Sequence, residues 1–366
     1  MEPALDRGPR GAGARRLILV GPYPPPWGGI AVHLRALQRL AMRHGFDVRV
    51  LDVGDGHGAR TGAGGVQGAG SYAAFGRALV RTAVDEAILH VHVPGNNAKA
   101  WMVAFAASRA RPGGLLSVHS GLAPALLERS PATRRLAWLA CAGFRRVLCA
   151  NDRIAGALEG SGVAPDRLEV LPAFVAGGVE PGRAPAPAEA ARQRWKRLLA
   201  AALAPAHHYG ADVLLDAVRI ARLRSPDLGC VVYGPGTGDG AFAAQVERSG
   251  LAGVVVGLGE IEQPAALAVT ALADAFVRPT RADGDSVSVR EALGLGVRVV
   301  ASDVGHRPAA ATLFRAGDAA ACAAAIEVAL AGPPPDPDAD GIDAGRRILD
   351  LWRSLGLRAI REGVVP

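Results

Sequence analysis

Short apolar runs alternate along the chain with segments whose apolar residues recur at helical spacing. The run at residues 17–20 ends in Gly21, which is typical of a buried strand that enters a loop. Beyond that loop Ile30, Leu34 and Leu37 fall on one face of a helix. This strand–loop–helix unit is the first of a series.

The same alternation continues through most of the chain. The apolar pattern predicts strands at residues 46–51, 87–92, 115–119, 146–150, 168–171, 230–233, 253–257, 275–278 and 297–301, and helices at residues 97–109, 131–143, 211–224, 242–249 and 287–294. Strands that alternate with helices form parallel sheets, which bind ligands at the carboxyl ends of their strands. The glycine-rich residues 54–70 are expected to be a loop.

A change in composition divides the chain in two. Residues 172–187 are rich in Gly, Pro and Ala and show no periodicity, which favours a linker. The prediction is an α/β protein with two Rossmann-like domains that face each other across a cleft. Its parts are a disordered tail at 1–15, an N-terminal domain at 16–175, a linker at 176–190, a C-terminal domain at 191–345, and a helix at 346–366 that returns to the N-terminal domain.

Charge and composition narrow the range of partners. The net charge of +7 favours anionic partners such as nucleotides or phospholipid headgroups. Nucleic-acid binding is disfavoured, because basic residues are not clustered with aromatic ones and aromatics make up only 5% of the chain.

The cysteines and the apolar runs bear on location. Four widely spaced cysteines without a CxxC pattern suggest small buried residues in a reducing compartment. No signal peptide and no membrane-spanning run is apparent, so we expect a cytoplasmic protein. Peripheral contact with the inner face of a membrane is an open alternative, since Trp195 lies among the arginines of residues 192–197.

The most informative segment is residues 278–303. A strand ends, a short polar loop follows, and a helix begins near Ser286, where free backbone N–H groups favour an anion. Asp283 lies in the loop and Glu291 in the helix. A carboxylate at such a place can accept hydrogen bonds from two vicinal hydroxyls. The alternative is a loop acid and a solvated helix residue without function.

This segment resembles the signature of retaining glycosyltransferase family 4, whose members have the GT-B fold. The signature is an acidic residue, seven residues, a glutamate, and later Val-Val-Ala-Ser-Asp, as from Asp283 through Glu291 to Asp303. Further matches are spread over most of the chain. They are the glycine-rich loop 21–29, the histidines His90, His92 and His119, the stretch 171–174, the Gly-x-Gly turn of Gly234 and Gly236, and the final helix at 349–355.

The resemblance implies a nucleotide-sugar site between an acceptor-binding N-terminal domain and a donor-binding C-terminal domain. Its catalytic residues would be His119, beside the anomeric carbon, and Asp283, against the transferred sugar. The donor-binding residues would be Gly28, Gly29, Gly234, Gly236, Arg281, Ser286, Val287, Ser288 and Glu291. Within that set, Glu291 would hold the ribose hydroxyls, and the two groups of residues would face each other across a gap.

One part of the family pattern is missing. The family holds the diphosphate with an arginine and a lysine, and Leu203 and Tyr209 stand at those positions. Their loss removes charge-assisted contacts to the leaving group. Our hypothesis is that Arg281, or one of His207 and His208, takes over.

The function implied by the resemblance is sugar transfer from a UDP- or GDP-sugar, with retention, to a glycan or lipid-linked acceptor in polysaccharide biosynthesis. No cofactor and no metal is expected. A second hypothesis is a catalytically weak donor-binding or scaffold subunit of a glycan-assembly complex. A third is another GT-B enzyme, such as a sugar-nucleotide epimerase, although the acidic motif argues against it.

Several residues also permit simpler interpretations. His119 ends a buried strand and could be structural, and a functional role for His90 and His92 is open. Asp283 and Asp285 form an Asp-x-Asp pair that occurs in metal sites, although such pairs are common in loops.

Overall fold

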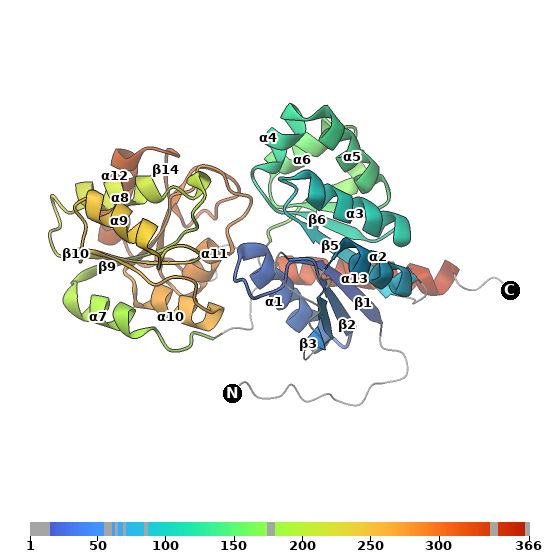
Figure 1. Cartoon of the computed structure of the whole chain (residues 1–366), viewed down its shortest axis with the longest axis horizontal. Helices are drawn as coiled ribbons and strands as arrows, with labels where there is room; N and C mark the ends of the chain where they lie inside the picture. Colours follow the sequence, from blue (N-terminus) through green and yellow to red (C-terminus); the bar gives the residue numbers. More distant parts are fainter. Residues whose placement is uncertain are drawn as a thin grey trace.

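The computed structural model describes residues 15–54, 61–62, 65–68, 71–83, 87–173, 180–336 and 343–362. It forms two α/β domains that lie side by side (Figure 1). The strands are β1 (Arg16–Gly21), β2 (Asp47–Asp52), β3 (Thr61–Gly62), β4 (Val66–Gly68), β5 (Ala87–Val93), β6 (Leu115–Val118), β7 (Arg146–Cys149), β8 (Leu168–Val170), β9 (Arg197–Ala202), β10 (Leu228–Tyr233), β11 (Val255–Gly257), β12 (Ala275–Arg278), β13 (Arg298–Ser302) and β14 (Thr312–Phe314).

Helices connect these strands. They are α1 (Gly29–Arg43), α2 (Tyr72–Ala83), α3 (Ala98–Ala110), α4 (Ala123–Arg129), α5 (Pro131–Ala142), α6 (Asp152–Glu159), α7 (Ala186–Arg194), α8 (Ala211–Ala221), α9 (Gly240–Arg248), α10 (Gln263–Leu272), α11 (Val287–Gly294), α12 (Ala319–Ala331) and α13 (Ala344–Glu362), with 3-10 turns at Pro165–Arg167 and His207–Tyr209.

Each domain is built on one sheet. In the described residues the order of the N-terminal sheet is β3-β4-β2-β1-β5-β6-β7-β8, and that of the C-terminal sheet is β11-β10-β9-β12-β13-β14. All neighbouring strands are parallel except the short pair β3 and β4. The carboxyl ends of the strands in each sheet therefore lie at one edge, where α/β proteins bind ligands. The predicted fold class is confirmed.

Buried residues alternate between the two faces of each sheet. In β1, Ile18 and Val20 join the core under α2 to α6, whereas Leu17 and Leu19 join the core under α1 and α13. Neighbouring residues of a strand point to opposite faces, so the sequence of a strand that is covered on both faces is a continuous apolar run. Residues 198–201 of β9 alternate in the same way between the two cores of the C-terminal domain.

The last helix packs on the first domain. Trp352 of α13 is fully buried and packs edge-on against Phe46, with ring centroids 5.7 Å apart. Its indole N–H donates to His90 Nδ1 at 3.2 Å, and Arg347 forms an ion pair with Glu169. Figure 1 shows α13 running along the N-terminal sheet, so the chain crosses between the domains twice.

One expectation needs correction. Residues 54–70 were expected to form only a loop, but β3 and β4 lie within them and extend the sheet beside β2; residues 55–60, 63–64 and 69–70 of that segment lie outside the described residues. Peripheral membrane contact by Trp195 stays a prediction; its ring packs on Gly229 between Arg194 and Arg222. Among the described residues, no helix combines the length and the apolar character that a membrane crossing needs.

Candidate functional site

The loop after β12 carries an acidic side chain enclosed by arginines. Asp283 Oδ2 accepts from Arg278 Nε at 3.0 Å and from Arg307 Nη2 at 3.2 Å, and the exposed fractions of the three side chains are only 4–11%. Burial alone would raise the pKa of Asp283, but the charges of the two arginines outweigh burial and lower it. Asp283 is therefore an ionised carboxylate with a local excess of positive charge around it.

The two arginines have hydrogen-bond donors beyond those that contact Asp283. Arg307 Nη1 is buried and has no hydrogen-bond partner, and such donors are rare in folded proteins. The Arg278 guanidinium lies 5.2 Å from the centre of the Tyr209 ring and donates to the Ala202 carbonyl at 3.1 Å. Arg278 thus lies at the two places, beside Leu203 and at Tyr209, where the resemblance leads one to expect cations. Sequence reasoning overlooked it, because it ends a buried strand.

Arg281 lies apart from this cluster. Its guanidinium forms two hydrogen bonds with Asp212, at 2.8 and 2.6 Å, at the start of α8. Its backbone N–H donates to the carbonyl of His208 at 2.7 Å. Arg281 fastens the loop to the 3-10 turn at His207–Tyr209, and it would have to leave Asp212 to contact a phosphate.

Glu291 lies in the second turn of α11. Its carboxylate accepts from Gln263 Nε2 at 2.6 Å. Burial raises the pKa of Glu291 to about 7, and the hydrogen bond from Gln263 opposes this shift only in part. Such a perturbed carboxyl group is typical of a ligand site.

The start of α11 is organised by its polar residues. Ser286 is the N-cap but makes no capping hydrogen bond with its side chain; its hydroxyl is instead 3.1 Å from that of Ser288. The first backbone N–H groups of the helix, including those of Val287 and Ser288, have no partner within the helix. The side chain of Asp285, by contrast, is held by the buried Arg290.

The glycines of the predicted site fall into two kinds. Gly28 and Gly29 begin α1, and a Cβ at either would meet open space. Gly234 and Gly236 have φ values of +119° and +76°, and a Cβ on Gly234 would lie 2.1 Å from the Leu203 carbonyl oxygen. The second pair is therefore required by the backbone turn itself.

Loops of the two domains meet around Asp283. Asn151 Nδ2 donates to the Gly284 carbonyl at 2.9 Å, and Asp285 Oδ2 accepts from the Ala173 N–H at 2.9 Å. A Cβ on Gly284 would lie 1.7 Å from the His119 carbonyl oxygen. His119 and the loop of Asp283 thus face each other, but the predicted gap is closed here: the backbones of Gly284 and His119 are in direct contact.

His119 lies beside the buried histidines His33 and His92. His119 Nε2 is 3.1 Å from His92 Nδ1, and the His33 ring packs against both. Burial lowers the pKa of His119 to about 4, so the imidazole is neutral at pH 7. His33 was not among the predicted residues; no motif marks it, because it is brought to the site by the packing of α1.

His90 is structural. Its Nδ1 accepts from the Trp352 indole, which can only donate, so Nε2 carries the proton and donates to Ser117 Oγ at 2.9 Å. Both ring nitrogens are satisfied, which favours a structural role for His90.

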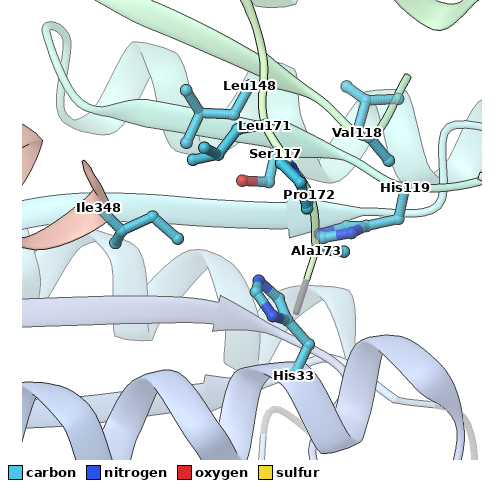
Figure 2. Close-up of a pocket in the computed structure, with 10 residues that line it drawn as sticks. His33, Ser117, Val118, His119, Leu148, Leu171, Pro172, Ala173 and Ile348 are labelled. Atoms are coloured by element: carbon cyan, nitrogen blue, oxygen red, sulfur yellow. The ribbon is translucent and has the colours of Figure 1, made fainter. Parts of the chain in front are cut away.

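A small cavity adjoins His33 and His119. It has a volume of about 10 Å³, roughly that of one water molecule, and is lined also by Ser117, Pro172 and Ile348. His33 and His119 point into it from different elements (Figure 2). Ligand pockets for drug-sized molecules are typically about 300–1,000 Å³, so a nucleotide sugar does not fit here without movement.

Comparison with known proteins agrees with this architecture. Residues 196–331 match the family model "Glycosyl transferases group 1", which is a little over a third of the chain. A comparison with curated sequences gives no match. Similar solved structures include Anabaena Alr3699/HepE in complex with UDP and glucose, with a TM-score of 0.64 and 17% identity over 95% of this chain and 99% of that one.

The fold is GT-B. Sucrose-phosphate synthase of Thermosynechococcus elongatus has a TM-score of 0.66 at 16% identity and covers 95% of this chain and 98% of its own. A UDP-forming α,α-trehalose-phosphate synthase of Burkholderia xenovorans has a TM-score of 0.64 at 15% identity, over 96% of this chain and the whole of that one. The GT-B fold places the segment of Asp283 and Glu291 in the domain that matches the family model.

Proposed function

We propose that this GT-B protein transfers a sugar from a nucleotide diphosphate to a glycan or lipid-linked acceptor in polysaccharide biosynthesis. The observation that carries the proposal is the ionised Asp283 between Arg278 and Arg307, on the loop that leads into α11. The group 1 glycosyltransferase match of this domain supports it. Similar structures are described as complexes with UDP and UDP-glucose, so a UDP-sugar is the first donor to test.

In this proposal the donor lies along α11. Glu291 accepts hydrogen bonds from the ribose hydroxyls, and the amides of Ser286, Val287 and Ser288 bind the diphosphate and the sugar. Gly28 and Gly29 allow the N-terminal domain to approach the diphosphate from the other side, since the space beside them is open. Gly234 and Gly236 shape the loop of Leu203, which forms the floor of the proposed donor site.

Arg278 takes the place of the missing cations. It already lies against Tyr209, and a small rotation about its side chain would exchange Asp283 for a phosphate oxygen. Arg307, which has a free donor, would keep Asp283 ionised. Arg281, the candidate from sequence, remains the competing hypothesis.

The chemistry then consists of positioning and charge stabilisation. Asp283 orients hydroxyls of the transferred sugar, and His119 donates or accepts near the anomeric carbon. The leaving diphosphate, stabilised by Arg278 and the α11 amides, takes the proton of the acceptor on the same face, so that configuration is retained. Asp283 and Asp285 are both engaged by guanidinium groups, which argues against a metal on this pair.

Donor binding requires the loops to separate. Because the backbones of Gly284 and His119 touch, the donor cannot enter between them in this arrangement. The few hydrogen bonds across this contact, from Asn151 and Ala173, allow an opening motion.

A second candidate function is a donor-binding or scaffold subunit with little activity. The observation that favours it is the replacement of both family cations by Leu203 and Tyr209. This candidate function also predicts that the chain binds the donor, but it predicts little or no turnover.

The deciding experiment is a screen of UDP- and GDP-sugars by thermal shift and by donor hydrolysis. Active transfer predicts stabilisation and slow hydrolysis, both lost in Asp283→Asn, with the exposed Asp216→Asn as the control. Stabilisation without turnover on any acceptor would favour the scaffold, and no effect of any nucleotide would contradict both.

A further inference from the structure

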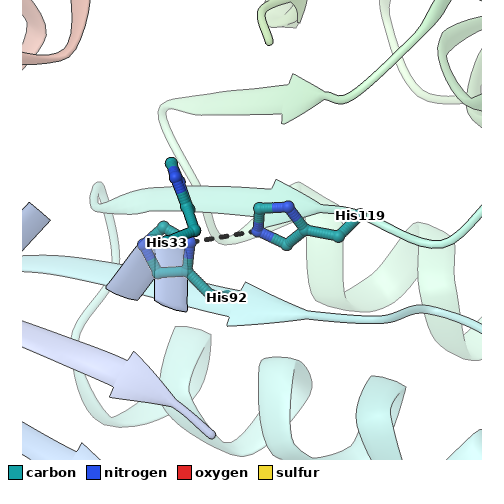
Figure 3. Close-up of side chains that lie close together, drawn as sticks. All are labelled: His33, His92 and His119. Atoms are coloured by element: carbon teal, nitrogen blue, oxygen red, sulfur yellow. Dashed lines mark hydrogen bonds between the residues drawn. The ribbon is translucent and has the colours of Figure 1, made fainter. Parts of the chain in front are cut away.

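Three imidazole rings form a nearly equilateral triangle inside the N-terminal domain. They come from His33 of α1, His92 of β5 and His119 after β6 (Figure 3). The ring centroids are 5.4, 5.3 and 5.4 Å apart. One ring nitrogen from each histidine lies within 4.8 Å of the other two. The proposed transfer mechanism uses His119 but neither His33 nor His92.

The hydrogen bonds of this triangle do not satisfy its nitrogens. His92 Nδ1 and His119 Nε2 share one hydrogen bond of 3.1 Å. His92 Nε2 and His33 Nδ1 are buried and have no partner. Buried polar atoms are nearly always paired, so two orphaned nitrogens in one cluster indicate a missing ligand.

The spacing suits a metal ion. Zinc binds histidine nitrogens at about 2.0–2.1 Å in tetrahedral geometry, which separates the nitrogens by about 3.3 Å and the ring centroids by about 5 Å. The observed centroid distances exceed this by only a few tenths of an ångström. The ring nitrogens lie within 4.8 Å of one another rather than about 3.3 Å, so zinc binding requires the rings to turn and the hydrogen bond between His92 and His119 to break.

The surroundings also suit a metal. His90, whose tautomer is fixed, packs on the His92 ring with centroids 4.1 Å apart and restrains its orientation. His33 and His92 are buried, and His119 is partly exposed, so two of the three ligands are shielded from bulk water. The cavity next to His33 and His119 leaves room for a water molecule as a fourth ligand.

The ligand set selects the class of ion. Three imidazoles without a carboxylate favour Zn²⁺ and its borderline neighbours such as Co²⁺ and Ni²⁺. Ca²⁺ and Mg²⁺ require oxygen ligands, which this cluster lacks.

We propose that His33, His92 and His119 bind one Zn²⁺ ion, with a water molecule from the adjacent cavity in the fourth position. The ion would join α1 to the ends of β5 and β6 and fix the ring of His119. This departs from the expectation of a protein without metal, which considered only Asp283 and Asp285. The site stands on the N-terminal domain alone and does not depend on sugar transfer.

The test is zinc binding by the full chain after treatment with a chelator. Titration calorimetry with Zn²⁺ should give one strong site per chain, and Co²⁺ should give the intense visible absorption of a tetrahedral complex. His33→Gln and His92→Gln should each weaken zinc binding about 100-fold or more, because each removes a ligand. His207→Gln, at an exposed histidine of the C-terminal domain, should leave it unchanged.

Circular dichroism in chelator separates loss of zinc from loss of fold. If one variant does not fold, the other decides. If neither folds, X-ray absorption of the zinc-loaded wild-type chain decides, and should show three imidazole nitrogens at about 2.0 Å. A wild-type chain that takes up no Zn²⁺, cluster variants that bind it as tightly as wild type, or a coordination shell without three imidazoles would overturn the proposal.

Discussion

At the scale of single residues, two carboxyl groups of the same segment have opposite electrostatics. The pKa of Asp283 is lowered because Arg278 and Arg307 outweigh burial. The pKa of Glu291 is raised to about 7 because only Gln263 compensates its burial. The proposed roles follow from this difference. Asp283 carries a negative charge throughout, whereas Glu291 is stabilised as a carboxylate once donor hydroxyls donate hydrogen bonds to it.

The Glu291 shift predicts a pH dependence of stability. The folded chain holds this proton up to about pH 7, while the unfolded chain releases it near pH 4.5. The stabilisation is therefore complete below pH 4.5 and is lost as the pH rises to about 7. Glu291→Gln cannot lose a proton, so its stability relative to wild type should rise across this window by about 3 kcal/mol.

Urea unfolding at several pH values measures this difference. Asp216→Asn, at an exposed acid of α8, is the control and should show no such trend. A constant difference between Glu291→Gln and wild type across the window would refute the raised pKa.

The choice between Arg278 and Arg281 gives a second prediction. Arg278→Ala should weaken UDP-glucose binding about 10- to 100-fold, since a charge-assisted hydrogen bond contributes about 1.5–3 kcal/mol. Arg281→Ala should change it less than about twofold, because Arg281 is bound to Asp212 on the surface and such pairs contribute little. Calorimetric titration of both variants decides; the reverse order of effects would support the hypothesis drawn from sequence.

At the scale of elements, the contact between the Gly284 loop and His119 controls access to the site. Gly284→Ala would place a methyl group on the His119 carbonyl oxygen, so we expect the domains to open. Small-angle scattering without ligand should show a larger radius of gyration. Gly294→Ala, at the end of α11 where a Cβ meets nothing, should leave it unchanged. Equal radii for both variants would mean that this contact does not hold the domains together.

The return of α13 is the second feature at this scale. Trp352→Ala should lower the free energy of unfolding by about 3–5 kcal/mol, because it empties a fully buried site and removes the hydrogen bond to His90. Arg353→Ala on the exposed side of the same helix should change it by less than about 0.5 kcal/mol. Denaturant midpoints compare the two; equal midpoints would show that α13 adds nothing to the core.

The sequence predicted elements where apolar spacing is regular and failed where alanine hides it. Strand β12 and helix α11 were predicted at their observed bounds, since both combine a clear pattern with polar flanks. Helix α12 was missed: alanine fills most of its positions, so no face stands out. Helix α6 was missed as well, although Asn151 caps its first turn and offered a signal.

The site was predicted only as far as motifs extend. Asp283 and Glu291 belong to one segment with recognisable spacing, and they lie in the domain that matches the family model. Arg307 and His33 carry no motif, because their neighbours come from distant parts of the chain. Arg278 lies inside an apolar strand pattern, where its partner Tyr209 could not be foreseen.

At the scale of the whole molecule, the C-terminal domain, whose residues 196–331 match the family model, lies against loops of the N-terminal domain. Helix α13 returns to the N-terminal domain after the C-terminal sheet is complete. The arrangement is closed, because the backbone of Gly284 touches that of His119. The proposed sugar transfer predicts alternation between this state and an open one, with the donor bound to the C-terminal domain in both.

A crystal structure with UDP-glucose tests this account most directly. It should show the ribose hydroxyls on Glu291, the diphosphate between Arg278 and the first amides of α11, and the Gly284 loop separated from His119. A nucleotide bound elsewhere, with no contact to Glu291 or Arg278, would contradict it.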